Sequence, residues 1–255
     1  MSRPGPPDPW IQHPRPRPGA RLRLFCLAHA GAGASTFRGW ADALPAAVEV
    51  CPVQLPGREN RMAERSFDRM DPLVEALGPA VLRSADLPFA VFGHSNGALI
   101  GFELARRLRR EGAPRPVHLF ASGRRAPDVP PRTPPTHRLP DDQFLADLRT
   151  LGGIPEQVLA HTELLALLLP LLRADVALNE TYEFREEPPL ELPITAYTGL
   201  ADARAPREDV EAWARHTARA FTVRGFPGGH FFIFSERDRV LETLARDLEG
   251  VVRGL

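Results

Sequence analysis

The chain has 255 residues, of which 43% are apolar and 25% charged, a composition typical of soluble globular proteins rather than disordered ones. Lys+Arg and Asp+Glu both number 32, so the net charge is zero and nucleic acid is not an expected partner. The two cysteines, Cys26 and Cys51, form no disulfide framework and lack the spacing of a metal site. We therefore expect a cytoplasmic protein without a structural or catalytic metal.

Residues 1–20 are rich in proline and arginine and contain no apolar stretch of the kind that signal peptides have. Because proline fixes φ and removes a backbone donor, we expect an extended, flexible arm there, with a proline-rich ligand segment as the alternative. The longest apolar run, 164–172, is interrupted by Pro170 and is shorter than the ~20 residues that cross a bilayer, so no membrane span is expected. Residues 21–255 are expected to form one domain.

Short apolar runs alternate with stretches that carry apolar residues at helical spacing. The runs are nearly continuous, which is typical of strands buried on both faces. This alternation predicts an α/β fold with a mostly parallel central sheet flanked by helices. The predicted strands are 22–28, 48–54, 89–93, 117–122, 194–198 and 221–226, and the predicted flanking helices are 73–83, 98–110, 207–219 and 237–253.

One region, about 126–190, breaks the alternation. It begins with many prolines and continues with two helical stretches, 141–151 and 156–184, which Gly152, Gly153 and Pro155 separate. No strand is predicted before residue 194, so we expect an inserted helical lid on the α/β core. The leucines at 164–172 allow two interpretations: a helix packed on both sides, or a helix that partly lines a cavity for an apolar substrate.

The sequence Gly93-His94-Ser95-Asn96-Gly97 matches the G-x-S-x-G pattern of a nucleophile elbow. A predicted strand precedes it and an amphipathic helix follows, as this motif requires. The glycines allow a turn so tight that the serine is strained and exposed at the carboxyl edge of the sheet. Ser95 is the predicted nucleophile, and the Asn96 N–H, at the start of a helix, is a predicted oxyanion donor.

A serine hydroxyl is a weak nucleophile at neutral pH and needs a base. Of the eight histidines, His230 fits best, because it follows strand 221–226, lies beside the pair Gly228-Gly229 and precedes the last helix. The chain order of this elbow places its base in such a loop. Other histidines are expected in the arm, in a loop, in helices or packed in the core: His13, His94, His118, His137, His161 and His216.

The base needs an acid that orients it, and this acid should lie between serine and histidine in the sequence, at the end of a strand. Asp202 follows strand 194–198 through a short loop and is the predicted acid. Asp209 opens a helix, where a carboxylate has a structural purpose, and Asp175 lies within a lid helix.

A second oxyanion donor is expected in the loop after the first strand, where the chain reads AHAGAGAS at 28–35. The small residues let the backbone approach a ligand closely, and we assign the donor to the Ala30 N–H. A plain turn between strand and helix is the alternative for this loop.

These motifs together resemble the type II thioesterases of polyketide and nonribosomal peptide biosynthesis, which have the α/β-hydrolase fold. The resemblance covers nearly the whole chain. One position departs from the family: Asn96 follows the serine where the family usually has methionine, and its polar side chain is expected to face the acyl pocket or the lid. The matching segments are HAGAG at 29–33, QLPGRENR at 54–61, GHSNG at 93–97, LRTLGGIP at 148–155, LRAD at 172–175 and GGHFF at 228–232.

The resemblance implies an editing hydrolase that removes stalled or aberrant acyl groups from the phosphopantetheine arm of acyl or peptidyl carrier proteins. It implies no metal and no diffusible cofactor, small acyl substrates, and a monomer that works with a carrier protein as partner. Two alternatives stay open: another serine esterase or acyltransferase of the same fold, and a non-catalytic chaperone that binds carrier proteins.

Overall fold

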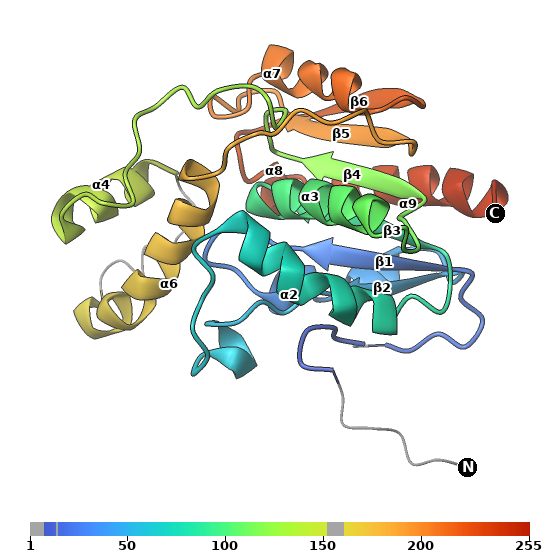
Figure 1. The fold of residues 1–255 in the computed structure, drawn as a ribbon, viewed down its shortest axis with the longest axis horizontal. Helices are drawn as coiled ribbons and strands as arrows, with labels where there is room; N and C mark the ends of the chain where they lie inside the picture. The colour runs from blue at the N-terminus through green and yellow to red at the C-terminus, as the bar shows by residue number, and fades with distance from the viewer. Residues whose placement is uncertain (1–7, 14, 152–160) are drawn as a thin grey trace.

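The protein is described by a computed structural model that covers residues 8–13, 15–151 and 161–255. Six strands form one sheet in the order β2-β1-β3-β4-β5-β6, and all five neighbouring pairs are parallel (Figure 1). This confirms the α/β class and the mostly parallel sheet. The strands are β1 (Leu22–Leu27), β2 (Val48–Pro52), β3 (Phe89–His94), β4 (His118–Ser122), β5 (Ile194–Gly199) and β6 (Phe221–Phe226).

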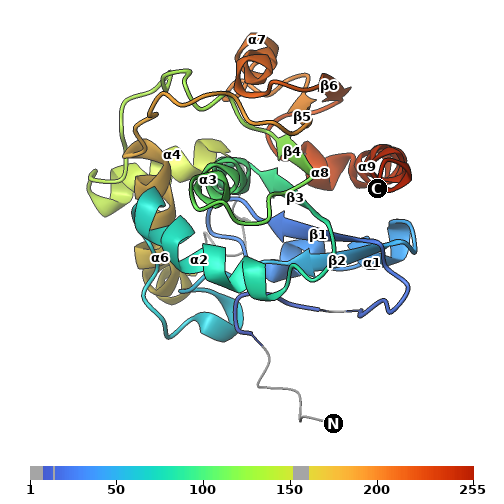
Figure 2. The same ribbon diagram turned by 45° about the vertical axis from the view of Figure 1, so that its right-hand side comes forward.

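Helices cover both faces of the sheet, which is why the central strands are apolar on both sides. α2 (Met70–Arg83) and α3 (Asn96–Arg110) lie on one face, and α1 (Trp40–Ala43) and α9 (Arg237–Arg253) on the other (Figure 2). Along β1, alternate side chains join the two resulting apolar cores: Phe25 and Leu27 one, Leu24 and Cys26 the other. Short elements complete these layers: the 3₁₀ helices Ala34–Phe37 and Glu59–Arg61, and α8 (Phe232–Ser235).

The predicted helix 207–219 is shorter than expected. The structure has α7 (Arg207–Glu211), followed by a 3₁₀ turn at Ala212–His216. Thr217 then forms a parallel bridge with Leu190, and its hydroxyl donates to the Leu192 carbonyl at 2.6 Å. These contacts hold residue 217 in an extended conformation, which ends the helical stretch.

The inserted segment, residues 126–190, contains α4 (Asp141–Leu151) and α6 (Thr162–Glu180), and its described residues contribute no strand to the sheet. Both helices lie beside the carboxyl ends of the strands, at the left of Figure 1. α6 continues through Pro170. The predicted turn at Gly152, Gly153 and Pro155 and the first residues of the predicted helix 156–184 lie outside the described residues.

The arm at 1–20 lies against the domain over the part that the structure describes, which its many prolines did not predict. Ile11 forms an antiparallel bridge with Val53 and is buried. The Trp10 ring packs against Phe67, and the Arg61 guanidinium lies 4.3 Å from the centre of the Trp10 ring. Two apolar side chains thus anchor this part of the arm. Among the described helices, none combines the length and apolar composition that crossing a bilayer requires.

Candidate active site

The predicted elbow lies between β3 and α3, at the carboxyl edge of the sheet. Ser95 has φ 55° and ψ −113°, in a region that residues with a side chain rarely adopt. Its backbone N–H donates to the Ser122 carbonyl at the end of β4, at 2.8 Å. The strained turn is therefore tied to the neighbouring strand, and it presents the serine hydroxyl above the sheet edge.

The two outer glycines of the motif are required by close backbone contacts. A Cβ atom on Gly93 would lie 2.1 Å from the Gly97 carbonyl oxygen, and one on Gly97 would lie 2.1 Å from the Leu27 carbonyl oxygen. Real Cβ atoms essentially never approach so closely, so a side chain on Gly93 would push the start of α3 away from β3, and one on Gly97 would push it away from β1. This is the physical reason for the spacing that the sequence shows.

The structure brings together the three predicted side chains Ser95, His230 and Asp202. His230 Nε2 lies 3.0 Å from Ser95 Oγ, and His230 Nδ1 lies 2.8 Å from Asp202 Oδ2. Because the carboxylate accepts a hydrogen bond, Nδ1–H donates to it, which leaves Nε2 free to accept from the serine hydroxyl. This is the arrangement in which an imidazole can remove the serine proton.

Asp202 is buried and is held as a carboxylate. Burial raises its pKa, but hydrogen bonds from His230 and from the backbone N–H groups of Arg204 and Ala205 outweigh burial and keep the pKa below its ordinary value. The two backbone donors lie 2.9 and 3.2 Å from Oδ1, on the oxygen that His230 does not use. The acid thus stays charged and fixed in orientation.

Backbone contacts place the loop of the acid beside the loop of the base. The Ala201 N–H donates to the Gly228 carbonyl at 2.9 Å. A Cβ on Gly199 would meet the Gly229 carbonyl oxygen at 2.4 Å, so only glycine permits this approach. Gly228 has φ 90°, in the left-handed region that favours glycine, and this turn directs His230 toward Ser95.

The two predicted oxyanion donors, Ala30 and Asn96, line one cavity together with Ser95 and His230. Asn96 is the first residue of α3, so its N–H has no acceptor within the helix. Ala30 precedes Gly31, which has φ 77°. Both residues lie where a backbone donor could point toward an oxygen next to the serine.

The cavity beside Ser95 has a volume of about 90 Å³. Residues of the inserted segment close it on one side, with apolar side chains from α4 and α6 and polar ones from the proline-rich stretch and the end of α6. Its lining among the described residues includes Leu148, Leu172, Val176, Thr133, Thr136, Asn179 and Glu180.

A second, larger cavity of about 590 Å³ lies on another side of α6, and Ser95 is not among its lining residues. Leu167 and Leu171 line this second cavity, whereas Leu172 lines the one beside Ser95. Leu165 is buried, and Leu164 is 38% exposed. Part of the leucine run thus packs, and Leu172 lines the cavity next to the serine; that this cavity takes an apolar substrate stays a prediction.

The rival acids lie elsewhere. Asp209 accepts two hydrogen bonds from the Arg132 guanidinium, each at 2.8 Å. Asp175 accepts two from Arg58, at 2.8 and 2.9 Å. Both carboxylates are thus engaged by arginines, and of the three candidate acids it is Asp202 that lies beside the predicted base.

Two histidines near the site are packed rather than poised to react. His94 is fully buried, with Nδ1 2.9 Å from the Ser122 hydroxyl, and burial lowers its pKa well below the ordinary value. His29, which the sequence analysis did not single out, has its ring 5.1 Å from the ring of Phe231. Burial, together with electrostatic interactions with the nearby His230 and Arg58 side chains, lowers the His29 pKa to about 4.

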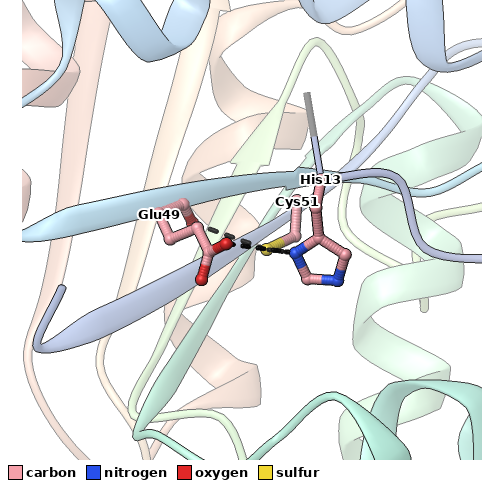
Figure 3. A group of neighbouring side chains, drawn as sticks. All are labelled: His13, Glu49 and Cys51. Carbon is pink, nitrogen blue, oxygen red and sulfur yellow. Dashed lines mark hydrogen bonds and ion pairs between the residues drawn. The ribbon is translucent and has the colours of Figure 1, made fainter. Parts of the chain in front are cut away.

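One group of possible metal ligands stands apart from this site. His13, Glu49 and Cys51 have donor atoms within 4.8 Å of one another, near the first residues of β2 (Figure 3). Glu49 is shared with Arg23, whose Nε lies 3.0 Å from the second carboxylate oxygen, and burial raises the pKa of the Cys51 thiol. The positively charged guanidinium of Arg23 and the protonated thiol of Cys51 both disfavour the binding of a cation. The ion pairs of Glu49 with Arg23 and His13 are enough to explain why these side chains lie together.

Comparisons with known proteins agree with this geometry. Residues 22–248 match the Thioesterase domain family. The chain is 42% identical to the gramicidin S biosynthesis protein GrsT of Aneurinibacillus migulanus, over 95% of each chain. It is similar to the solved structure of the RedJ thioesterase from the prodiginine pathway of Streptomyces coelicolor, with 42% identity, a TM-score of 0.84, and coverage of 96% of this chain and 94% of that one.

A further solved structure is the type II thioesterase BorB from the borrelidin cluster, at 40% identity and a TM-score of 0.85, with 94% of this chain and 97% of that one covered. Their names place these relatives in the biosynthesis of gramicidin S, prodiginine and borrelidin, and the two solved structures share the fold over nearly their full length. The chain therefore belongs to the thioesterase family, hydrolases that act on thioesters, and its relatives include type II thioesterases.

Proposed function

We propose that the protein is an editing thioesterase of polyketide or nonribosomal peptide biosynthesis. It would hydrolyse stalled or aberrant acyl groups from the phosphopantetheine arm of acyl or peptidyl carrier proteins. The observation that carries this proposal is the contact chain from Ser95 through His230 to Asp202, in a chain 42% identical to a gramicidin S biosynthesis protein.

The proposed reaction uses the contacts of these three side chains. His230 Nε2 takes the proton of the Ser95 hydroxyl as the serine oxygen attacks the thioester carbonyl carbon. The N–H groups of Ala30 and Asn96 would hold the oxyanion of the tetrahedral intermediate. The C–S bond breaks, the thiol of the carrier arm leaves with the proton from His230, and Ser95 holds the acyl group as an ester. A water molecule, deprotonated by His230, then releases the acid and restores the serine.

Every step uses this chain's own groups and water, so the proposal includes no metal and no cofactor. Asp202 orients His230 and stabilises its charged form between the two proton transfers. The inserted segment would act as a lid that shields the acyl group and opens for the carrier arm. We further propose that the protein acts as a monomer in the cytoplasm, where the thiols of Cys26 and Cys51 stay reduced.

A direct test compares two substrates that carry the same short acyl group: a thioester on a purified carrier protein and a p-nitrophenyl ester. We expect kcat/KM for the carrier thioester to exceed that for the ester by at least about 100-fold, because binding of the carrier adds to transition-state stabilisation. A higher kcat/KM for the ester would indicate an esterase instead.

A fluorophosphonate probe separates an enzyme from an inert binding protein. We expect covalent labelling of the wild-type chain at Ser95, found by peptide mass spectrometry, because the probe reacts with activated serines. A chain that binds the acyl carrier protein but takes up no label would be a chaperone, and the proposed reaction would be wrong.

A further inference from the structure

One aspartate of α6 makes a buried ion pair with the loop that follows β2. The carboxylate of Asp175 accepts hydrogen bonds from Arg58 Nη1 at 2.8 Å and from Nη2 at 2.9 Å. The two side chains are only 4% and 5% exposed. A buried charge that loses its partner is costly, so this pair holds α6 against the β2 loop in one position.

The same carboxylate reaches the loop that carries Ala30. Gly31 donates its backbone N–H to Asp175 Oδ2 at 2.6 Å, and Arg58 Nη1 donates to the Ala32 carbonyl at 3.2 Å. The Gly31 N–H is the amide that directly follows Ala30. Its direction is thus fixed by a residue of α6. The Ala30 N–H belongs to the preceding peptide unit, which meets this one at the Ala30 Cα, so the contact restricts the Ala30 N–H through the φ and ψ angles of Ala30.

The main chain of Asp175 contacts the elbow as well. Asn96 Nδ2 donates to the Asp175 carbonyl at 2.7 Å, a buried hydrogen bond between residues 79 positions apart. Asn96 is the residue whose backbone N–H forms the other predicted oxyanion donor. The polar side chain after the nucleophile thus faces the inserted segment, one of the two orientations that the sequence analysis expected.

We propose that Arg58, Asp175 and the Asn96 side chain form a clasp that positions the oxyanion hole when α6 is docked. The proposal rests on the proposed function, because it assigns the Ala30 and Asn96 N–H groups as the oxyanion donors. Asp175 contacts the surroundings of both donors. Its carboxylate holds the N–H of Gly31, which follows Ala30, and its backbone carbonyl holds the side chain of Asn96. Docking of α6 therefore acts on the surroundings of both donors at once.

A clasp differs in a measurable way from a plain anchor. If Asp175 only fixed α6 in place, its loss would lower stability or loosen substrate binding, and KM would rise while kcat stayed the same. If Asp175 positions the donors, its loss weakens contacts that matter most in the transition state, and kcat falls. The ratio of the two effects separates the two roles.

The test measures kcat and KM with an acyl-carrier thioester for Asp175→Ala, Asn96→Leu and the double variant. Removal of a single oxyanion donor costs about 10²–10³ in kcat, so we expect about 100-fold for Asp175→Ala and about 10-fold for Asn96→Leu, with KM within about threefold of wild type. The double variant should lose less than the product of the single losses, because both contacts hold the same helix against the same donors.

Asp209→Asn is the control, since Asp209 of α7 also accepts two hydrogen bonds from an arginine, Arg132, and neither residue lines the cavity beside Ser95. We expect its kcat to stay within about threefold of wild type. Circular dichroism and urea unfolding check that each variant folds. Should Asp175→Ala not fold, Asn96→Leu still reads out the clasp, because it keeps the Arg58–Asp175 pair and the Asn96 backbone.

The proposal is overturned if Asn96→Leu and a folded Asp175→Ala lose no more kcat than Asp209→Asn, or if the two single losses simply multiply. A parallel Ser95→Ala variant distinguishes this from a failure of the proposed function. Loss of turnover in Ser95→Ala with normal kcat in both clasp variants rejects the clasp alone, whereas a fully active Ser95→Ala rejects the nucleophile and the clasp together.

Discussion

The edge of the sheet around Ser95 and the inserted segment above it are held in different ways. The edge is fixed by backbone contacts: glycines packed without room for a Cβ, the Ser95 N–H on the Ser122 carbonyl, and the Ala201 N–H on the Gly228 carbonyl. The inserted segment is fixed by side chains. Asp175 pairs with Arg58 and accepts from Gly31, and Glu180 accepts from the backbone N–H groups of residues 136 and 137 at 2.8 Å.

This difference separates two tasks. The backbone contacts tie the elbow to the sheet, so we expect the geometry of Ser95, His230 and Asp202 to change little when a substrate binds. If the inserted segment acts as the proposed lid, its opening would exchange a few side-chain contacts for water, at a cost that binding of a carrier arm would have to offset. We therefore expect changes at the edge to abolish turnover, and changes in the inserted segment to alter rate and acyl preference.

The largest of these effects should come from the orienting acid. Asp202→Asn favours the wrong tautomer of His230 and cannot stabilise its cation, a change that costs about 10⁴ in kcat in a serine protease. We expect a loss of about 10²–10³ here, because a thiolate leaves more readily than an amine and needs less help from the general acid. Steady-state kinetics of Asp202→Asn, Asp175→Asn and Asp209→Asn check this order. A greater loss in Asp209→Asn would move the acid assignment to that residue.

The next prediction concerns how the free energy of unfolding depends on pH through His29, in the loop after β1. The pKa of His29 is lowered to about 4 in the folded state, from 6.5. Between pH 6.5 and about pH 4, the unfolded chain therefore binds more protons at His29 than the folded chain does. The stability that goes with a neutral His29 is present above pH 6.5 and is lost as the pH falls toward 4. At 1.36 kcal/mol per pKa unit, the full shift from 6.5 to about 4 corresponds to about 3 kcal/mol.

We expect His29→Gln to show a smaller fall in the free energy of unfolding than wild type between pH 7 and pH 4.5, measured by urea unfolding. His161→Gln, at an exposed histidine before α6, serves as the control and should follow wild type. Equal pH dependence in wild type and His29→Gln would show that His29 is not held neutral by the fold.

The smallest effect concerns acyl preference. Leu148 of α4 lines the cavity beside Ser95, whereas Leu167 of α6 lines the separate larger cavity. Leu148→Phe should shift the ratio of kcat/KM values toward shorter acyl groups by about 10-fold, because a single methylene in an apolar pocket changes selectivity by about that factor. Leu167→Phe should leave the ratio unchanged. Equal selectivity in both variants would show that the acyl group occupies neither position.

The sheet and the relative positions of Ser95, His230 and Asp202 could be predicted from the sequence, because each depends on a local pattern. Buried parallel strands read as short apolar runs, and the elbow and the Gly228-Gly229 pair mark turns that only glycine permits. The chain order of the elbow then limited the choice of base and acid. Strand ends differ from the prediction by two residues or fewer in every strand.

The contacts of the inserted segment could not be predicted in the same way. Arg58 and Asp175 are 117 residues apart, and only the folded chain brings them together. One signal was present: Asp175 follows a run of leucines, where a carboxylate must find a partner if it is buried. The packing of Trp10 and Ile11 could not be predicted either. The many prolines of the arm indicate an extended, flexible segment, but the contacts of these two apolar residues hold it against the domain.

The central claim is that Ser95 attacks the thioester of a carrier-bound acyl group. The most direct test is the rate at which Ser95→Ala releases acid from an acyl-carrier thioester, measured beside wild type with circular dichroism to confirm folding. We predict that the variant folds normally and keeps less than about a hundredth of the wild-type rate, because a chain without its nucleophile retains only binding and oxyanion stabilisation. A folded Ser95→Ala variant with more than about a hundredth of that rate would show that another group carries out the attack.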